Sequence, residues 1–205
     1  MRRRLASIIL TVFMVFSMST TSFAASSKSY LMYNQDLSPG RITDIGSLLT
    51  AYGYSNYNSS DPTKSTLINR LNNGSIVFFH THGNSSGGVL VTYRGNLKAN
   101  DLTSAGVDLA YLSACYSGKS STSNGYFPTK LSSLGVNMSV SFSSTISATT
   151  STNGIHHFNY LVFKYLTQGY TLASAVSYAE SYVFSTYGQY YGCNNVVIVG
   201  TWNTL

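Results

Sequence analysis

The chain has 205 residues, with 12 lysines and arginines against 6 aspartates and glutamates, for a formal net charge of +6. Only 9% of the residues are charged and 43% are hydrophobic, including 17 Tyr and 10 Phe, which excludes an intrinsically disordered chain. The 3 prolines exclude a collagen-like or proline-rich chain, and this length favours one domain with a sizeable core.

The N-terminus has the layout of a secretory signal peptide. Three arginines at 2–4 form a positive segment, an apolar run follows to residue 18, and the tripeptide at 22–24 has the small-x-small pattern of a cleavage site. The apolar run is shorter than the roughly 20 residues of a membrane-spanning helix. We therefore expect a signal peptide at 1–24 and a secreted domain at 25–205, with no stable insertion in a membrane.

The positive charge comes largely from this segment. The nine remaining lysines and arginines are scattered between Lys28 and Lys164 without a run, against the same six acidic residues. A nucleic-acid partner would need a basic patch, so we expect none.

Hydrophobic periodicity and turn residues predict the elements of the domain. In chain order they are a strand at 30–33, helices at 42–52 and 61–73, strands at 76–79 and 89–93 with a turn at 95–96, a helix at 100–105, a strand at 109–112, a helix at 127–134, a strand at 136–142, helices at 158–166 and 172–183, and a strand at 195–199. Continuous apolar strands that alternate with helices favour a mainly parallel sheet covered on both faces. The expected fold class is therefore α/β, a three-layer α/β/α sandwich.

Two of the predicted strands end in reactive residues. The strand at 76–79 is followed by His82 and Gly83, and the strand at 109–112 is followed by Cys115. Active sites of open α/β sheets gather at the carboxyl ends of strands, so neighbouring strands would bring His82 and Cys115 to one edge. There the imidazole could take the thiol proton while the thiolate attacks a carbonyl. The amides of Gly83 and Cys115 are candidates for an oxyanion hole.

These two blocks resemble the signature of the caspase-like (clan CD) cysteine peptidases, which include caspases, legumain, gingipains and clostripain. The stretch from Leu112 to Gly118, which reads Leu-Ser-Ala-Cys-Tyr-Ser-Gly, is most similar to the CHAT-type branch. The resemblance covers residues 75–200 by motif. It implies a caspase-like α/β/α fold and a cysteine endopeptidase with His82 as base and Cys115 as nucleophile, acting on a peptide or protein substrate without a metal or an organic cofactor.

The chain departs from this family at one position. In several clan members that cut after basic residues or Asn, the residue two positions before the cysteine is acidic and lines the specificity pocket. Here that residue is Ser113, so a preference for Lys or Arg is not supported. The candidates for the substrate pocket are Ser113, His80 and Ser143.

A disulfide is the main alternative for the cysteine. Cys115 and Cys193 are the 2 cysteines of the chain, and a pair of cysteines in a secreted protein often forms a bridge. The histidine and cysteine blocks favour a free Cys115, and the state of Cys193 stays open.

The other histidines allow a zinc site to be considered. His80 and His82 form a His-x-His pair, but the nearby sequence supplies no carboxylate at the spacing of a metal-dependent isopeptidase. We expect no metal site and a buried or semi-buried His80 whose ring is hydrogen-bonded to backbone. His156 and His157 open a helix, where we expect surface or capping positions, although they could line the cleft.

Two further functions remain open. Folds of this kind can lose activity, because function resides in the site rather than the fold, so a catalytically inactive cell-surface binding or structural domain is one alternative. A transpeptidase or amidase that uses the same acyl-enzyme chemistry is the other.

Overall fold

The computed structural model describes residues 28–34, 41–56, 63–150 and 152–205. The expected signal peptide at 1–24 and the start of the mature domain lie outside the described residues. The expected helix start at Asp61 lies outside them as well.

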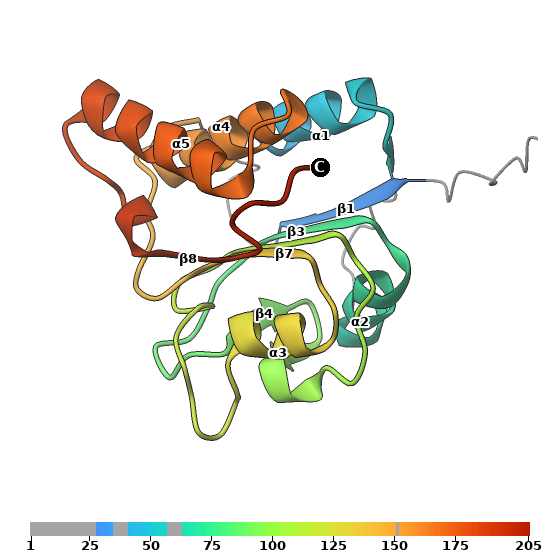
Figure 1. The fold of residues 1–205 in the computed structure, drawn as a ribbon. Helices are drawn as coiled ribbons and strands as arrows, with labels where there is room; N and C mark the ends of the chain where they lie inside the picture. Colours follow the sequence, from blue (N-terminus) through green and yellow to red (C-terminus); the bar gives the residue numbers. More distant parts are fainter. Residues whose placement is uncertain (1–27, 35–40, 57–62, 151) are drawn as a thin grey trace, which may run out of the picture.

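The described chain contains the following elements in order (Figure 1). They are β1 (Ser29–Asn34), α1 (Ile42–Ala51), β2 (Ser55–Asn56), α2 (Lys64–Asn73), β3 (Ile76–His80), β4 (Val89–Thr92), β5 (Gly95–Lys98), the 3-10 helix η1 (Ala99–Asp101), β6 (Leu109–Ser113), α3 (Phe127–Ser133), β7 (Met138–Phe142), α4 (Ile155–Thr167), α5 (Leu172–Tyr187), the 3-10 helix η2 (Cys193–Asn195) and β8 (Val196–Val199).

The described residues form a six-stranded sheet with the strand order β2-β1-β3-β6-β7-β8. Its strands pair in parallel except for β7 and β8, which are antiparallel. Strands β4 and β5 form a separate antiparallel hairpin. The predicted fold class, a three-layer α/β/α sandwich with a mainly parallel sheet, is confirmed.

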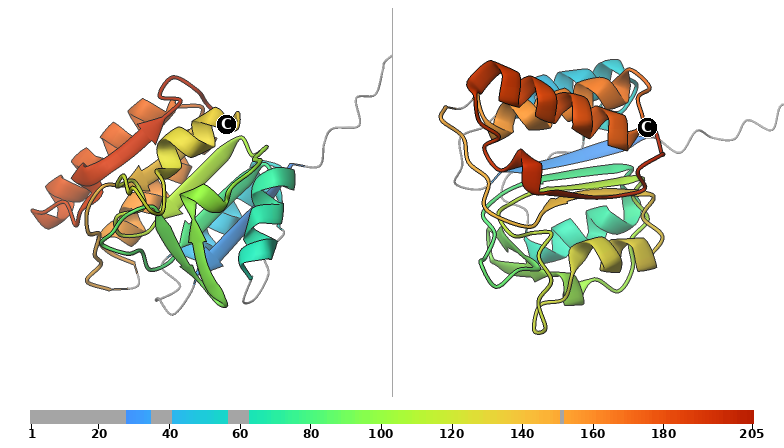
Figure 2. Two further views of the ribbon diagram at one scale, coloured as in Figure 1. Left: turned by 90° about the horizontal axis from the view of Figure 1, so that it is seen from below. Right: turned by 60° about the vertical axis from the view of Figure 1, so that its left-hand side comes forward.

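Alternate residues of the central strands pack on opposite faces of the sheet, because successive side chains of a strand point to opposite sides. On one face, Ile76 and Phe78 join a core with α1, α4 and α5. On the other face, Val77 and Phe79 join a core with α2, α3 and the hairpin. Figures 1 and 2 show these two helical layers on either side of the sheet.

Several element boundaries differ from the sequence predictions. Helix α2 begins at Lys64, where the hydroxyl of Thr63 caps it by accepting a hydrogen bond from the Thr66 amide. The expected turn at Gly95 and Asn96 is wrong, because these residues begin β5 and pair with β4. The expected helix at 100–105 is reduced to the single turn η1.

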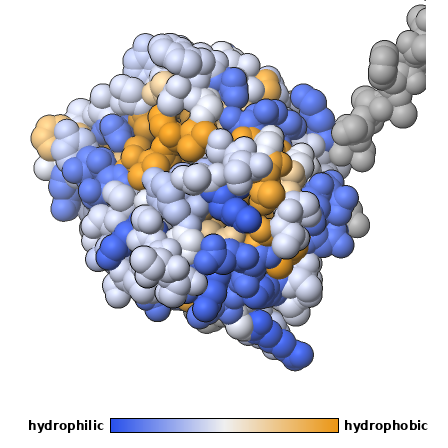
Figure 3. Space-filling model, turned by 60° about the horizontal axis from the view of Figure 1, so that its bottom comes forward, coloured by the Kyte–Doolittle hydropathy of each residue, from blue (hydrophilic) through white to orange (hydrophobic). Residues whose placement is uncertain are grey.

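No helix in the described part of the chain is long and apolar enough to cross a membrane. On the side of the molecule turned forward in Figure 3, hydrophobic residues form separate patches among hydrophilic and neutral ones.

Candidate active site

The sheet brings the two reactive blocks together. Strands β3 and β6 are parallel neighbours whose last residues, His80 and Ser113, are paired in register. Because both chains continue in the same direction, His82 and Cys115 each lie two residues beyond this pair, at the carboxyl edge of the sheet. The condition for the predicted meeting of His82 and Cys115, that the two strands are neighbours, is met.

A cavity of about 410 Å³ lies at this edge. Residues 80–82 line it after β3, and Ser113 and Cys115 line it after β6. The loop residues 146–150 and the first turn of α4 complete its wall. The candidate base, the candidate nucleophile and two of the three pocket candidates therefore share one cavity.

Cys115 is half-buried and held by backbone contacts. The Ile146 amide donates a hydrogen bond to its sulfur at 3.4 Å, and the thiol faces the Ile146 carbonyl oxygen at 3.6 Å. The next residue, Tyr116, has a φ of 58°, so the chain turns sharply directly after the cysteine. Strained backbone of this kind is concentrated at functional sites.

His82 is exposed at the mouth of the cavity. Its carbonyl oxygen accepts a hydrogen bond from the Val91 amide at 2.9 Å, which ties the loop after β3 to strand β4. Within the described chain, no hydrogen bond joins the His82 ring to the Cys115 sulfur. Hydrogen bonds between catalytic groups are often long or absent until a substrate is bound, so the missing bond does not exclude a catalytic pair.

Gly83 lies close to the Cys115 amide. A Cβ built on Gly83 would lie 3.2 Å from the Cys115 nitrogen. Among the described residues, neither amide donates a hydrogen bond to a protein acceptor. The two N–H groups thus remain available to a ligand, as an oxyanion hole requires.

A buried hydrogen-bond network lies behind the cavity. The Nδ1 atom of His80 lies 3.0 Å from the Ser113 hydroxyl, to which the Asn159 side-chain amide donates at 2.8 Å. The Tyr111 hydroxyl in turn donates to the Asn159 side-chain oxygen at 2.9 Å. His80 is buried as predicted, and its ring contacts Ser113, through the hydroxyl at 3.0 Å and through the backbone.

Burial is the main cause that lowers the pKa of His80, to about 3, and the neighbouring His156 and His82 lower it further. Hydrogen bonding to the Ser113 backbone acts in the opposite direction and is outweighed. His80 is therefore neutral at physiological pH, and its ring is a weak base.

The other predicted positions are divided between the cavity and the surface. His156 is buried and lines the cavity, with its ring 4.7 Å from the His80 ring, so the expected surface or capping position is wrong. His157 takes a half-buried position where its Nδ1 atom lies 2.7 Å from the Tyr187 hydroxyl. Ser143 is exposed, outside the lining of the cavity, and its hydroxyl donates to the Asn195 carbonyl.

Sequence reasoning did not identify Asn159 or Ile146. Asn159 lies beside Phe158 in the predicted helix, where a polar residue next to the apolar face is a weak signal. Ile146 contributes backbone atoms, for which the sequence carries no signal.

The two cysteines are both free thiols, so the Cys115–Cys193 bridge is not formed. Cys193 is buried at η2. In the part of the chain that the structure describes, no three His, Cys, Asp or Glu side chains come together as a metal site.

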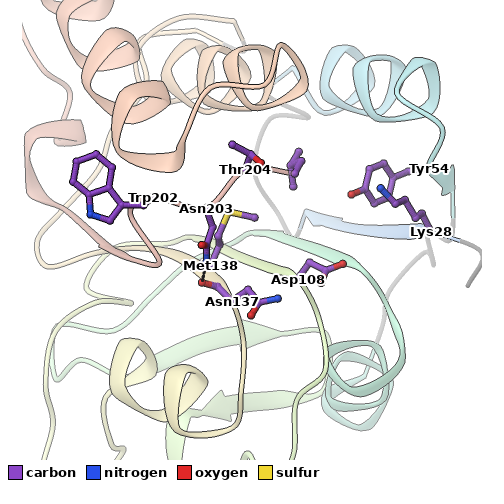
Figure 4. Close-up of a pocket in the computed structure, with 9 residues that line it drawn as sticks. Lys28, Tyr54, Asp108, Asn137, Met138, Trp202, Asn203 and Thr204 are labelled. Carbon is purple, nitrogen blue, oxygen red and sulfur yellow. Dashed lines mark hydrogen bonds between the residues drawn. The ribbon is translucent and has the colours of Figure 1, made fainter.

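A second cavity, of about 530 Å³, lies at the opposite edge of the sheet. It is lined by Asp108 and Asn137, which precede β6 and β7, and by the C-terminal residues 202–205 (Figure 4). The Asn203 side chain donates to the Asn137 carbonyl at 3.0 Å. No histidine or cysteine lines this cavity, so the candidate nucleophile and base both lie at the other edge.

The comparisons with solved structures settle the fold. The chain aligns with the crystal structure of the Arg-specific cysteine proteinase gingipain R (RgpB), with a TM-score of 0.68 and 15% identity over 87% of this chain and 47% of that one. The chain has the gingipain fold. The caspase-like fold that the sequence resemblance implied is thus confirmed.

A second match is the complex of Porphyromonas gingivalis RgpB pro- and mature domains, with a TM-score of 0.63 and 14% identity over 87% of this chain and 49% of that one. The chain therefore spans about half the length of these gingipain structures. It matches no protein-family model and no curated protein.

Proposed function

We propose that this protein is a secreted cysteine endopeptidase that uses Cys115 as nucleophile and His82 as base. The observation that carries the proposal is that both residues line one cavity at the carboxyl ends of adjacent parallel strands. The gingipain fold, which is that of a cysteine proteinase, adds support. The partner is a peptide or protein substrate rather than a nucleic acid or a membrane.

The reaction follows from these groups. His82 takes the thiol proton, and the Cys115 sulfur attacks the scissile carbonyl, whose oxygen becomes an oxyanion facing the Gly83 and Cys115 amides. The carbon–nitrogen bond then breaks, and the imidazolium gives its proton to the departing amine. Water, deprotonated by His82, hydrolyses the thioester and regenerates the thiol. This sequence needs no metal and no cofactor.

The specificity of the gingipain neighbour does not carry over. That enzyme is described as Arg specific, and a cationic side chain needs a carboxylate partner when it is bound in a cavity. Among the described residues, the cavity is lined by 80–82, Ser113, Cys115, 146–150, Ile155 and His156, and none of these is acidic. We do not expect cleavage after arginine.

The test is hydrolysis of a mixed peptide library by the mature protein. We expect Cys115→Ala to lower the rate at least about 10³-fold and His82→Ala to lower it about 10²–10⁴-fold. Cys193→Ala is the matched control, since it removes the other thiol and should leave hydrolysis intact. Full activity of Cys115→Ala would overturn the proposal.

Two outcomes would identify the alternative functions. A protein that cleaves no peptide and whose Cys115 reacts with a peptidyl electrophile no faster than an ordinary exposed thiol would be an inactive binding domain. A protein that transfers the acyl group to an added amine in preference to water would be a transpeptidase.

Secretion is tested by the N-terminus of the exported protein. Cleavage after the small-x-small tripeptide predicts a mature chain that begins at Ala25. Retention of the first 24 residues in exported material would contradict the signal-peptide prediction.

A further inference from the structure

Thr81 connects two parts of the structure directly beside the candidate base. It follows β3, and its amide donates a hydrogen bond to the Ser113 carbonyl of β6 at 3.2 Å. Its side chain is buried, so the hydroxyl needs a protein acceptor. That acceptor is the Val91 carbonyl of β4, at 2.7 Å. Thr81 thus fastens the end of β3 to the central sheet on one side and to the hairpin on the other.

The hairpin is a firm support for this contact. Leu90 of β4 and Leu97 of β5 are paired across it and buried in the core that β3 shares with α2 and α3. Leu90 also forms an antiparallel bridge with Gly83. Because Leu90 directly precedes Val91, this packing fixes the backbone that accepts the bond from Thr81.

The contact between Thr81 and Val91 leads directly to His82. The Val91 amide donates to the His82 carbonyl at 2.9 Å. Both backbone polar groups of Val91 are therefore bound by residues 81 and 82. The His82 side chain is exposed, so the position of its ring relative to Cys115 depends on how firmly this backbone is held.

We propose that Thr81 is a positioning residue for the candidate base. Its hydroxyl holds the loop after β3 on β4 and thereby keeps the His82 ring where it can take the proton of Cys115. The inference rests on the proposed peptidase function, and Thr81 acts in it through His82 rather than on the substrate. Proton transfer needs a base within hydrogen-bond reach, and a misplacement of about 1 Å can lower a rate about 10²-fold.

The test compares two valine substitutions that remove the same group. Thr81→Val keeps the shape of the side chain and leaves the Val91 carbonyl without this donor. Thr92→Val is the matched control, because Thr92 has the same 3% exposure and its hydroxyl donates to another backbone carbonyl of the hairpin, that of Gly95. Both variants should lose stability to a similar extent, since each leaves a carbonyl without its hydroxyl donor. Only Thr81→Val is expected to release His82.

Peptide hydrolysis shows whether catalysis depends on this hydroxyl. We expect Thr81→Val to lower kcat at least about tenfold with KM nearly unchanged, because proton transfer is impaired and substrate binding is not. Thr92→Val should keep both parameters close to those of the unsubstituted protein, and Thr81→Ser, which retains a hydroxyl, should restore kcat. Equal kcat values for the two valine variants would overturn the inference. A change confined to KM would also overturn it, because Thr81 would then act on substrate binding.

A double substitution shows whether Thr81 acts through His82. The rate at which a peptidyl electrophile alkylates Cys115 is measured with and without Thr81→Val, first in the unsubstituted protein and then in His82→Ala. A residue that acts through the ring has no effect once the ring is absent, so the two proteins that carry His82→Ala should react at the same rate. A loss as large as in the unsubstituted protein would show that Thr81 acts independently of His82, contrary to the inference.

Hydrogen exchange measures the contact without relying on activity. The Val91 amide is bound to the His82 carbonyl, so its exchange reports whether the loop stays on the hairpin. Thr81→Val is expected to speed this exchange at least about tenfold, and Thr92→Val to change it less. Unchanged exchange in Thr81→Val would overturn this inference and leave the proposed function intact. Absence of both hydrolysis and Cys115 labelling in the unsubstituted protein would instead overturn the proposed function and this inference with it.

Discussion

Gly83 lies against the backbone of Cys115, so that a Cβ added to Gly83 would overlap the Cys115 carbonyl oxygen. The loop after β3 and the loop after β6 thus meet through backbone atoms. Glycine is the one residue that allows this approach. The contact fixes the histidine block against the cysteine block, because Gly83 directly follows His82.

Gly83→Ala is predicted to damage both the site and the fold. The overlap involves rigid backbone atoms, so one of the two loops must move, and we expect a loss of about 1–3 kcal/mol or more of unfolding free energy. The displacement should also slow alkylation of Cys115 by a peptidyl electrophile. Chemical denaturation and the alkylation rate measure the two effects.

Gly53→Ala separates this effect from backbone strain. Gly53 has a φ of +98° and no atom within 4 Å of an added Cβ, so the substitution costs about 1 kcal/mol of strain without a clash. It should destabilise the protein slightly and leave the Cys115 alkylation rate unchanged. Equal effects of the two substitutions on alkylation would contradict the close-contact explanation.

The two thiols are predicted to differ in reactivity. Cys193 is fully buried. Burial is the main cause that raises the pKa of its thiol to about 12, and the nearby Glu180 raises it further. Since the thiolate is the reactive form, Cys193 should be inert in the native protein, whereas the half-buried Cys115 should react. Mass spectrometry after brief alkylation is expected to show one modified residue, Cys115.

Unfolding supplies the control for this prediction. In denaturant both thiols are exposed, so two modifications are expected. Modification of Cys193 at the same rate as Cys115 in the native protein would show that its site opens readily.

His80 predicts a pH dependence of stability. Its pKa is about 3 in the folded protein and about 6.5 when unfolded. Between these values the unfolded state binds a proton that the folded state does not, so stability falls as the pH falls below about 6.5, by about 1.4 kcal/mol per pH unit for this one group. The pKa of His157 is also lowered, mainly by burial and further by the charges of Arg41 and Lys164. His157 therefore also makes the protein less stable as the pH falls.

The contribution of His80 is isolated by comparing His80→Asn with the unsubstituted protein. Urea denaturation at pH 7, 6 and 5 should show that the variant loses about 2 kcal/mol less stability across this range, with most of the difference between pH 6 and 5, because the slope approaches about 1.4 kcal/mol per pH unit only well below pH 6.5. The same slope in both proteins would mean that His80 titrates in the folded state as it does when unfolded.

The layout of the sheet and the meeting of the two blocks could be predicted from the sequence. The strands at 76–79 and 109–112 are continuous apolar runs, and parallel strands end at one edge, so the placement of His82 and Cys115 follows from direction alone. Their catalytic roles stay predictions. The buried position of His156 could not be predicted, because it depends on how the loop before α4 folds back onto the sheet.

The buried hydrogen-bond network behind the cavity could not be predicted from the sequence for a similar reason. The position of Ser113 follows directly from the strand register. Asn159, however, contacts Ser113 from α4, and 46 residues separate the two in the sequence. Helix periodicity shows which face is apolar, not which strand residue that face meets. The hydrogen-bond partner of a single polar residue beside an apolar face therefore cannot be predicted until the position of the helix on the sheet is known.

Ser117 gives the last prediction, because it connects the loop after Cys115 to the sheet. Its buried hydroxyl lies 2.9 Å from the Leu112 and Ala114 carbonyl oxygens and accepts a hydrogen bond from the Phe142 amide of β7 at 3.1 Å. Ser117→Ala leaves that buried amide without this acceptor, so we expect a loss of about 1–3 kcal/mol of unfolding free energy. Ser133→Ala removes an exposed hydroxyl with one local bond to Lys130 and should change stability by less than about 0.5 kcal/mol. Denaturation curves of the two variants check the difference, and equal stabilities would show that the Ser117 hydroxyl does not hold the loop after Cys115 on β7.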